Sequence, residues 1–371
     1  MRAVVLRHVG TAPAVEQVEL ADPKRGEIVV RIEAAGVCHS DYHYMSGDLA
    51  APLPLVLGHE GSGVVEKLGP DAGDAGGGEL AIGDRVALLW RPRCGSCVAC
   101  LSGNPALCVK GGVQASTGGL PDGTSRLSFP DGTELHHLMG VSCFAERVVV
   151  SESAVVKVPE GVPPEVAAIS ACAVVTGVGA VLNVVERAAG AGLLVVGAGG
   201  VGLSSVMGAR LVGANPIIVA DVDPAKLDLA LELGATHVVD SRRSDLVEEV
   251  TRITGGTGVP WAVEAVGRQA TLEQAFECVA AGGTLVAVGL GASDARFTVP
   301  LNRLVQKQKR VVGSLYGSAN PPIDLPRIFS LYLEGRLPLD RLIGERMPLA
   351  DVGRAYDALM SGSVGRSILV P

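Results

Sequence analysis

The chain has 371 residues and a formal net charge of -8, with 48% hydrophobic and 19% charged residues. This length exceeds what one compact core usually serves, so we expect two domains, and the composition is that of an ordered globular protein. The acidic balance, without any run of Lys and Arg, argues against a nucleic-acid partner, because such proteins present a basic face to phosphates.

The N-terminus reaches His8 without an apolar stretch of signal-peptide length, which predicts a cytoplasmic location. Residues 166–185 carry no charged side chain and are about long enough to cross a bilayer. The segment is rich in Ala and Gly and includes Ser170, Thr176 and Asn183, so we interpret it as a buried enzyme helix and expect no membrane association. Eight cysteines then point to metal binding or catalysis, because cytosolic thiols are kept reduced.

The first part of the chain reads as strands separated by Gly and Pro, for example over residues 27–33 and 144–150, and predicts a mostly β domain. The glycine-rich stretch 71–78 is predicted to be an exposed loop. From about Val166, helix-length apolar segments alternate with short β-rich runs, which is typical of a parallel sheet flanked by helices. These runs are 193–196, 216–220, 237–239 and 284–288, and a last run at 367–370 follows after the alternation is lost near residue 314.

A glycine-rich loop directly follows the run 193–196 and precedes a helical pattern. Gly197 permits a tight turn, Gly199 lets backbone N–H groups approach a pyrophosphate, and Gly202 allows close packing of helix on sheet. Asp221 closes the next strand about twenty residues later, where a carboxylate accepts hydrogen bonds from the adenosine ribose. We interpret the ordered set as a dinucleotide site rather than as a glycine-rich turn beside a surface aspartate. The full loop is Gly197, Ala198, Gly199, Gly200, Val201 and Gly202.

The acidic residue also bears on which nicotinamide cofactor binds. A carboxylate at Asp221 would repel a 2′-phosphate, and no arginine follows it, so the sequence predicts NAD rather than NADP. Lys226 is placed either to reach the same ribose or to act as a solvated helix lysine.

Two cysteine patterns predict metal sites. Cys94, Cys97, Cys100 and Cys108 fall within fifteen residues, a spacing that closes a tetrahedral zinc site and leaves no position for substrate, so this zinc is predicted to be structural. A zinc module for nucleic acid is the competing interpretation, but the chain is acidic and no recognition helix follows.

The second set is dispersed along the chain. Cys38, His59 and Cys172 would hold zinc with its fourth position open, as in a catalytic site. Each of them alone would more often be a buried core residue.

Together these motifs resemble the zinc-containing medium-chain alcohol dehydrogenases over essentially the whole chain. The resemblance is carried by Gly58-His59-Glu60, the four-cysteine segment and the glycine-rich loop, and a further likeness to the longer animal and plant type lies in residues 122–126 and His136-His137. It implies a GroES-like, mostly β catalytic domain over residues 1–173 with a zinc lobe at 91–112, a Rossmann NAD-binding domain over 174–313, and a return to the catalytic domain over 314–371. It also implies two zinc ions per chain and, from the longer loop around 116–137, a homodimer.

The resemblance further implies roles for single residues. Asp41 and Glu60 match acidic groups near the catalytic zinc. Ser40 matches the hydroxyl that contacts the alcohol, and His43 matches the histidine that receives the proton through Ser40 and a cofactor ribose hydroxyl and passes it to solvent. The remaining matches are His39 and Arg366 at the cofactor pyrophosphate, Thr176 and Val201 beside the nicotinamide, and Trp90 at a bulky substrate-pocket position.

The expected reaction interconverts a primary or secondary alcohol with its aldehyde or ketone. A sister class oxidises the thiol adduct of formaldehyde and grips the thiol carrier with an acidic residue and an arginine. This chain has Leu49 and Gly112 at those positions, although Asp48 lies one residue away, so the sister class stays open as an alternative. A non-enzymatic zinc-binding regulatory protein is the more distant alternative.

Overall fold

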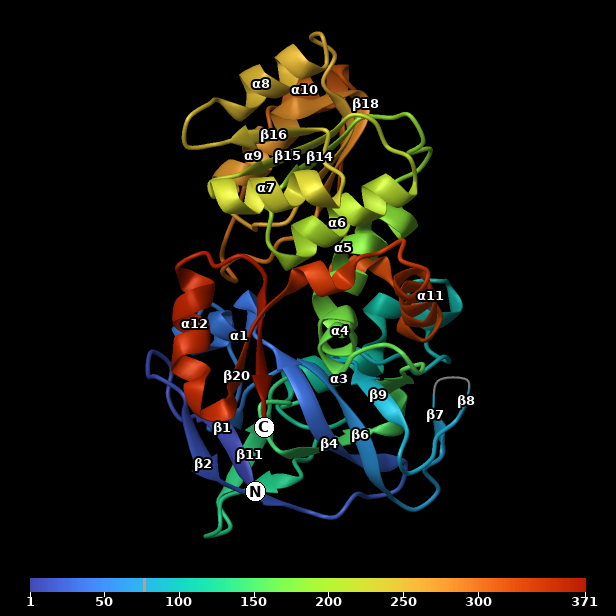
Figure 1. Cartoon of the computed structure of the whole chain (residues 1–371), viewed down its shortest axis with the longest axis vertical. Coiled ribbons are helices and arrows are strands. Elements are labelled where there is room, and N and C mark those ends of the chain that lie inside the picture. The colour runs from blue at the N-terminus through green and yellow to red at the C-terminus, as the bar shows by residue number, and fades with distance from the viewer. Residues whose placement is uncertain (76–77) are drawn as a thin grey trace. The chain divides into compact units, whose positions relative to one another are not determined.

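The computed structural model describes every residue except 76 and 77, and the described residues form two compact units (Figure 1). The first unit comprises Met1–Cys172 and Asn320–Pro371, and the second comprises Ala173–Ala319. The loop predicted over residues 71–78 lies partly outside the described residues. The predicted fold class, a mostly β unit combined with a parallel-sheet unit, is confirmed.

The first unit is built on two larger sheets. One runs in the order β2 (Ala14–Gln17), β1 (Arg2–Leu6), β5 (Leu55–Val56), β11 (Glu134–His137), β10 (Leu127–Ser128) and β3 (Glu19–Leu20). The other runs in the order β13 (Val155–Lys157), β9 (Arg85–Leu88), β6 (Glu60–Leu68), β4 (Glu27–Gly36), β21 (Arg366–Val370) and β20 (Ile343–Pro348), with β12 (Arg147–Ser151) also paired to β4. β7 (Asp74–Ala75) and β8 (Gly78–Glu79) pair antiparallel in a separate two-stranded sheet.

Strand β4 lies at the centre of the first unit. It pairs antiparallel with β6, β12 and β21, so most of its aliphatic side chains are buried. The pairing of Ile368 with Gly36 brings the last strand of the chain back to this unit. The helical segments of the unit are α1 (His39–Ser46), α2 (Val98–Leu101), η1 (Pro105–Leu107), α3 (Val109–Ser116), η2 (Glu152–Ala154), α4 (Pro164–Ile169), α11 (Pro321–Leu333), η6 (Leu339–Leu342), η7 (Leu349–Asp351) and α12 (Val352–Met360).

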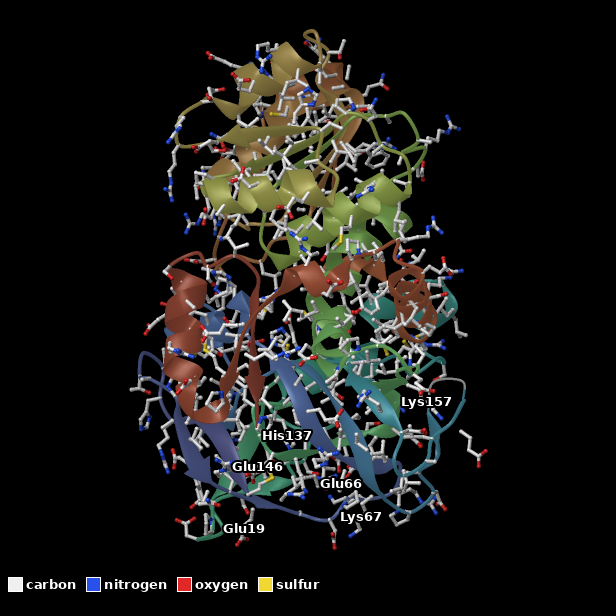
Figure 2. The ribbon with its side chains drawn as sticks, viewed as in Figure 1. Glu19, Glu66, Lys67, His137, Glu146 and Lys157 are labelled. Carbon is white, nitrogen blue, oxygen red and sulfur yellow. The ribbon has the colours of Figure 1, made fainter. Side chains whose placement is uncertain are left out.

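Charged side chains connect the strands of this sheet on its solvent side. Glu66, labelled in Figure 2, forms ion pairs with two arginines: its Oε1 lies 3.2 Å from Arg31 Nε, and its Oε2 lies 2.6 Å from Arg147 Nε. It thereby joins β4, β6 and β12. Glu33 pairs in the same way with Arg85 of β9 at 2.8 Å. Such half-exposed pairs contribute little each, but they specify which strands lie side by side.

The segment between α3 and β11 is anchored by a buried arginine. Arg126 donates from Nε to Glu27 at 2.9 Å and from Nη2 to Asp122 at 2.8 Å, and its backbone N–H donates to His137 Nε2 at 3.2 Å. Burial lowers the pKa of His137 to about 3, so its imidazole is neutral and can accept this bond. The residues that carried the likeness to the longer dehydrogenase type therefore tie this segment to the start of β4.

The second unit is a parallel sheet flanked by helices (Figure 1). Its order is β16 (His237–Asp240), β15 (Ile217–Asp221), β14 (Leu193–Val196), β17 (Val259–Glu264), β18 (Val279–Ala287) and β19 (Arg310–Gly313), and neighbouring strands are parallel throughout. Counted along the chain this is the 3-2-1-4-5-6 order of doubly wound dinucleotide-binding sheets. The helical segments are α5 (Val175–Gly179), η4 (Ala180–Val184), α6 (Gly200–Leu211), α7 (Pro224–Leu233), α8 (Leu246–Ile253), α9 (Gln269–Cys278), α10 (Leu301–Gln306) and η5 (Leu315–Ser318).

Two strands of the second sheet were not predicted from the sequence. β17 contains Pro260, which cannot donate to the ladder, and the register with β18 shifts between Val259 and Trp261. β19 is a short strand at the sheet edge and lacks a buried face, so its sequence carries no strong alternation. By contrast, the predicted runs 193–196, 216–220 and 237–239 coincide with β14, β15 and β16 to within about one residue.

Within the described residues, one helical stretch is long and apolar enough to span a membrane, and it covers Pro164–Val184. Its most apolar window is 89% buried inside the protein, so it is an interior helix, as predicted. The stretch is not uniformly α-helical, because the π-helical segment η3 (Ser170–Val174) follows α4 and η4 follows α5. The chain passes from the first unit to the second within η3.

We predict that Gly202→Ala destabilises the second unit, whereas Gly199→Ala does not. A Cβ atom at Gly202 would collide with the carbonyl oxygen of Gly197, so the first turn of α6 would have to move away from β14. At Gly199 a Cβ atom would meet nothing within 4 Å, and the backbone there is extended. Amide hydrogen exchange of the β14–α6 region should show a loss of about 3 kcal/mol for the first variant. Equal protection in both variants would contradict the packing role of Gly202.

Candidate functional site

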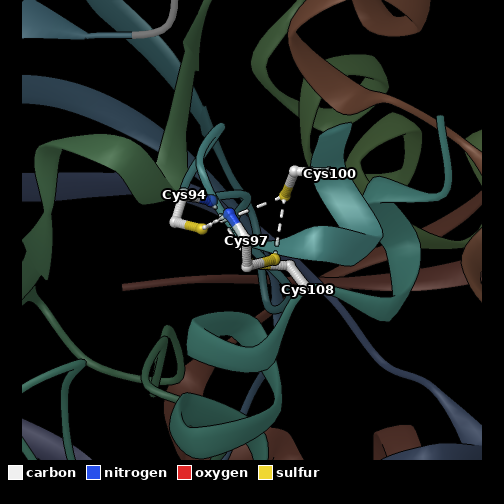
Figure 3. Close-up of side chains that lie close together, drawn as sticks. All are labelled: Cys94, Cys97, Cys100 and Cys108. Atoms are coloured by element: carbon white, nitrogen blue, oxygen red, sulfur yellow. Dashed lines mark hydrogen bonds between the residues drawn. The ribbon is translucent and has the colours of Figure 1, made fainter. Parts of the chain in front are cut away.

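The first candidate centre is a cluster of cysteine thiols in the lobe formed by α2, η1 and the start of α3 (Figure 3). The sulfur of Cys97 lies 3.5 Å from that of Cys100 and 3.9 Å from that of Cys108, and the sulfurs of Cys94 and Cys100 are 4.0 Å apart. Tetrahedral zinc with Zn–S bonds of about 2.3 Å requires sulfur separations of about 3.8 Å. The thiols therefore lie at the spacing of a closed Zn–S4 site.

Backbone groups around the lobe favour thiolates. The N–H of Cys97 donates to the Cys94 sulfur at 3.3 Å, and the N–H of Cys94 donates to the Cys108 sulfur at 3.2 Å. Hydrogen bonds from the backbone and side chain of Ser96 contribute most to lowering the pKa of Cys94 to about 5. Because metal ligands must be deprotonated, these bonds prepare Cys94 for a cation, whereas burial raises the pKa of Cys100 to about 12.

The lobe has little apolar core of its own. Its large hydrophobic side chains point outward, and Val98 and Leu101 are 83% and 75% exposed. Leu107 and Val109 are also exposed. A segment that buries so little depends on another source of cohesion, which a bound metal would supply.

The second candidate centre lies inside the first unit and collects residues that are far apart in the sequence. Cys38 precedes α1, His59 and Glu60 stand at the start of β6, and Cys172 lies on η3. Their ligand atoms all lie within 4.8 Å of one another, and all four side chains are buried. The structure thus brings together the dispersed residues Cys38, His59 and Cys172, and Glu60, which the resemblance implies near this zinc, lies with them.

The orientation of His59 is fixed by Asp41, which is fully buried. His59 Nδ1 lies 2.9 Å from Asp41 Oδ1, and the backbone N–H of Cys38 donates to Asp41 Oδ2 at 3.3 Å. If Asp41 is a carboxylate, Nδ1 is the donor, and the Nε2 lone pair faces the other donors. Among the described residues His59 Nε2 has no hydrogen-bond partner, although it is buried. Two sulfurs, an unpartnered imidazole nitrogen and a nearby carboxylate fit a zinc ion with an open position.

The charges around this centre are closely coupled. A hydrogen bond from Cys172 is the largest cause that lowers the pKa of Cys38 well below its ordinary value, and the charge of Arg366 acts in the same direction. Burial raises the pKa of Glu60 to about 8, and Arg366 opposes that rise. Arg366 Nε lies 3.4 Å from Glu60 Oε2, and Arg366 Nη1 donates to the Val37 carbonyl at 2.9 Å. Arg366, predicted as a pyrophosphate contact, thus also lies against the donor cluster.

Helix α1 carries the predicted proton-transfer residues. The hydroxyl oxygen of Ser40 lies 3.7 Å from the Cys38 sulfur. His43 is one turn further along, partly exposed, and its Nδ1 lies 3.0 Å from Asp48 Oδ2. His39 is exposed at the start of the helix, and Trp90 is half-buried against the core of the first unit.

The glycine-rich loop joins β14 to α6 in the second unit. Gly197 has a left-handed backbone (φ 94°), and Gly199 caps the helix without a side-chain hydrogen bond. The first N–H groups of α6 therefore lack intrahelical partners and favour an anion. Asp221 ends the neighbouring strand β15, and its Oδ2 accepts from the Ala198 N–H at 2.6 Å. The other predicted cofactor residues of this unit are Val201 on α6, Thr176 on α5, which is buried, and Lys226 on α7, which is half-buried.

Two features of the site were not found from the sequence. One is the π-helical turn that carries Cys172, for which an apolar Ala- and Val-rich stretch gives no local signal, although such turns are frequent at functional sites. The other is the contact between Asp48 and His43. Their separation of five residues would not predict it, because they meet only after the helix ends at Gly47.

Comparison with known proteins gives matches over the full chain. A family described as alcohol dehydrogenase GroES-like domain matches residues 24–160, and one described as zinc-binding dehydrogenase matches residues 200–333. The chain is 34% identical to S-(hydroxymethyl)glutathione dehydrogenase of Paracoccus denitrificans, covering 100% of this chain and 99% of the relative. It is 36% identical to NDMA-dependent alcohol dehydrogenase of Amycolatopsis methanolica, covering 100% and 98%. A crystal structure of an alcohol dehydrogenase zinc-binding domain protein from Burkholderia ambifaria superposes with a TM-score of 0.93 at 36% identity, covering 100% and 98%.

We predict that the purified chain holds two zinc ions that can be lost separately. Cys100→Ala should remove only the lobe zinc and lower the melting temperature, because the lobe has little other cohesion. Cys172→Ala should remove only the zinc of the buried centre. Cys278→Ala is the matched control, because Cys278 is a buried thiol outside both clusters. Elemental analysis combined with thermal melting distinguishes these cases. Full zinc content and unchanged melting in Cys100→Ala would show that the four-cysteine assignment is wrong.

Proposed function

Because the chain belongs to the zinc-containing medium-chain alcohol dehydrogenase family, we propose that it transfers a hydride between a primary or secondary alcohol and NAD. It is an oxidoreductase of the zinc alcohol dehydrogenase type, which excludes the non-enzymatic regulatory protein that the sequence alone left open. The observation that carries the proposal is the buried set of Cys38, His59 and Cys172, since its donors fit a zinc ion that keeps one position for substrate.

The metal would be held by two thiolates and the His59 imidazole. Bound there, zinc would supply Lewis-acid polarisation of a substrate oxygen. Asp41 keeps the imidazole in the required orientation, and Arg366 offsets part of the negative charge that Cys38 brings to the centre. The near-complete burial of these side chains excludes water from the donor set.

The chain's own residues would then position substrate and move the proton. The Ser40 hydroxyl lies beside the Cys38 sulfur, where it can accept a hydrogen bond from the hydroxyl of an alcohol. His43 lies three residues further along α1 toward the exposed end, so it is placed to pass the proton on to water. Trp90 is proposed to narrow the substrate pocket.

NAD would be held by the glycine-rich loop of the second unit, and it would supply a hydride acceptor. His39 and Arg366 stay predicted contacts of its pyrophosphate. Within the second unit, Gly197 turns the backbone, Gly199 and Gly200 leave room beside the start of α6, and Gly202 lets the helix pack on β14. The Asp221 carboxylate lies at the edge of this loop, where ribose hydroxyls are bound. Thr176, Val201 and Lys226 are proposed as further cofactor contacts, and the homodimer stays a prediction.

A second candidate is oxidation of the thiol adduct of formaldehyde. It is favoured by the names of relatives such as the S-(hydroxymethyl)glutathione dehydrogenase of Paracoccus denitrificans. Against it, Leu49 and Gly112 stand where the sister class would have an acidic residue and an arginine. We therefore propose a free alcohol, and not the thiol adduct, as the substrate.

Turnover of free alcohols tests the proposed function directly. We expect NAD reduction with simple primary alcohols in the absence of any thiol, and no gain in kcat/KM of more than about tenfold with S-hydroxymethyl thiol adducts. Cys172→Ala should abolish turnover while NAD binding, followed by fluorescence titration, is retained. Cys278→Ala serves as the control with wild-type rates. A protein that reduces NAD only when thiol and formaldehyde are both added would establish the second candidate.

We expect kcat/KM to favour NAD over NADP in the native protein, because the Asp221 carboxylate repels a 2′-phosphate. Asp221→Gly combined with Val222→Arg should shift the ratio toward NADP, since it removes the carboxylate and adds a phosphate partner. Val222 is exposed, so the arginine can be accommodated without repacking. A native preference for NADP would contradict the assignment before any variant is made.

A further inference from the structure

The segment after α1 brings an acidic side chain back against the helix. Gly47 ends α1 in a left-handed conformation (φ 86°), and a Cβ atom there would lie 2.7 Å from Cγ1 of Val9. The next turn is closed by the Leu49 N–H, which donates to the His43 carbonyl at 3.0 Å. The position of Asp48 relative to His43 is thus set by the backbone and not only by its own side chain.

The contact of Asp48 with His43 is specific to one ring nitrogen. Asp48 Oδ2 lies 3.0 Å from His43 Nδ1 and also accepts from the Ser46 hydroxyl at 2.8 Å. These two bonds lower the pKa of Asp48 below its ordinary value, so its side chain is a carboxylate at neutral pH. An ionised carboxylate can only accept hydrogen bonds, so Nδ1 must carry the hydrogen. In the neutral ring this leaves the lone pair on Nε2.

We propose that Asp48 is a positioning residue that holds His43 in the tautomer whose Nε2 accepts the proton released during alcohol oxidation. The inference rests on the proposed function, because it assigns a partner to the proposed proton-transfer histidine. In the forward step the proton arrives on Nε2, the ring becomes an imidazolium with Nδ1–H directed at the carboxylate, and Nε2–H is then given to water. Asp48 stays ionised throughout.

This assignment also accounts for the acidic residue that kept the thiol-adduct alternative open. Oδ2 of Asp48 is bonded to both His43 and Ser46, so gripping a thiol carrier through this atom would require breaking those bonds. The same pair at an ordinary protein surface would contribute little to stability, because Asp48 is 40% exposed. The importance of the pair therefore lies in the tautomer it selects and not in folding energy.

The first test reads the tautomer directly. Nitrogen-15 NMR of the ¹⁵N-histidine-labelled protein, with the His43 signals identified by their loss in His43→Gln, should show hydrogen on Nδ1 of the neutral ring. Asp48→Asn should move the population toward hydrogen on Nε2, since an amide can also donate to Nδ1. Asp22→Asn is the matched control, because Asp22 is an exposed carboxylate that pairs with Lys67 in the same unit. A wild-type ring with hydrogen on Nε2 would overturn the proposal.

The second test is a double-mutant cycle on the rate of hydride transfer, measured at pH 7 with ethanol and NAD in single-turnover mode. His43→Gln and Asp48→Asn should each slow the step about three- to tenfold with little change in the ethanol concentration that gives half the maximal rate, and the double variant should be no slower than His43→Gln. High concentrations of imidazole buffer should rescue both single variants, Asp48→Glu should restore part of the rate, and Asp22→Asn should leave it unchanged.

The outcomes separate the inference from the function on which it rests. If His43→Gln slows the step but Asp48→Asn does not, the inference is overturned and the proposed function stands. If Asp48→Asn slows the step by the same factor in both backgrounds, Asp48 acts through the fold and not through His43, which also overturns the inference. If the wild-type protein turns over and neither variant slows it, proton transfer does not run through His43, and both the relay and the inference fail. Zinc content and melting temperature of each variant exclude unfolding as the cause.

Discussion

The buried hydrogen bond between Asp41 and His59 is the contact on which the arrangement of the first unit's donors depends. Burying a carboxylate destabilises a protein unless its oxygens accept hydrogen bonds. Asp41 is fully buried, and its oxygens contact the His59 ring and the backbone N–H of Cys38. These two bonds join the start of α1 to the start of β6. The sulfur of Cys38 and Nε2 of His59 are thereby directed into the same small volume, where Cys172 and Glu60 complete the set.

This centre also shows what the sequence could and could not reveal. Two thiolates and an imidazole are a known donor set for zinc with an open position, but Cys38, His59 and Cys172 were singled out through the resemblance that they complete. The position of Glu60 near this zinc was expected from the resemblance alone, since adjacent residues on a strand usually point to opposite faces and its neighbour His59 is itself a donor. Here the neighbour of Glu60 precedes β6 and is turned by Gly58 at φ 96°, so the usual alternation does not apply. Backbone detail of this kind depends on tertiary packing and has no short-range signature.

In the second unit the sequence was more informative, because its elements follow simple rules. Parallel strands buried on both faces are continuous apolar runs. The run 193–196 and the glycines after it therefore predicted both the central strand β14 and the start of α6. The two strands that were not predicted lack this pattern: β17 contains Pro260, and β19 is a short edge strand. The doubly wound order could still be inferred, because it depends on how successive strand–helix units pack and not on each strand being recognisable.

Helix α1 connects the buried donor set with solvent, and the proposed reaction requires both. Hydride transfer requires water to be excluded from the donor set, whereas the proton released from an alcohol has to reach solvent. Eight helical residues span only about 12 Å, yet the helix begins beside the buried Cys38 and ends at the exposed Ser46. Ser40 and His43 lie between these ends, on the way from the buried donor set to the exposed end of the helix. Asp48 lies just beyond the exposed end of this helix, where a carboxylate can be ionised at little desolvation cost. It can therefore orient His43 with fewer hydrogen bonds than the buried Asp41 needs to orient His59.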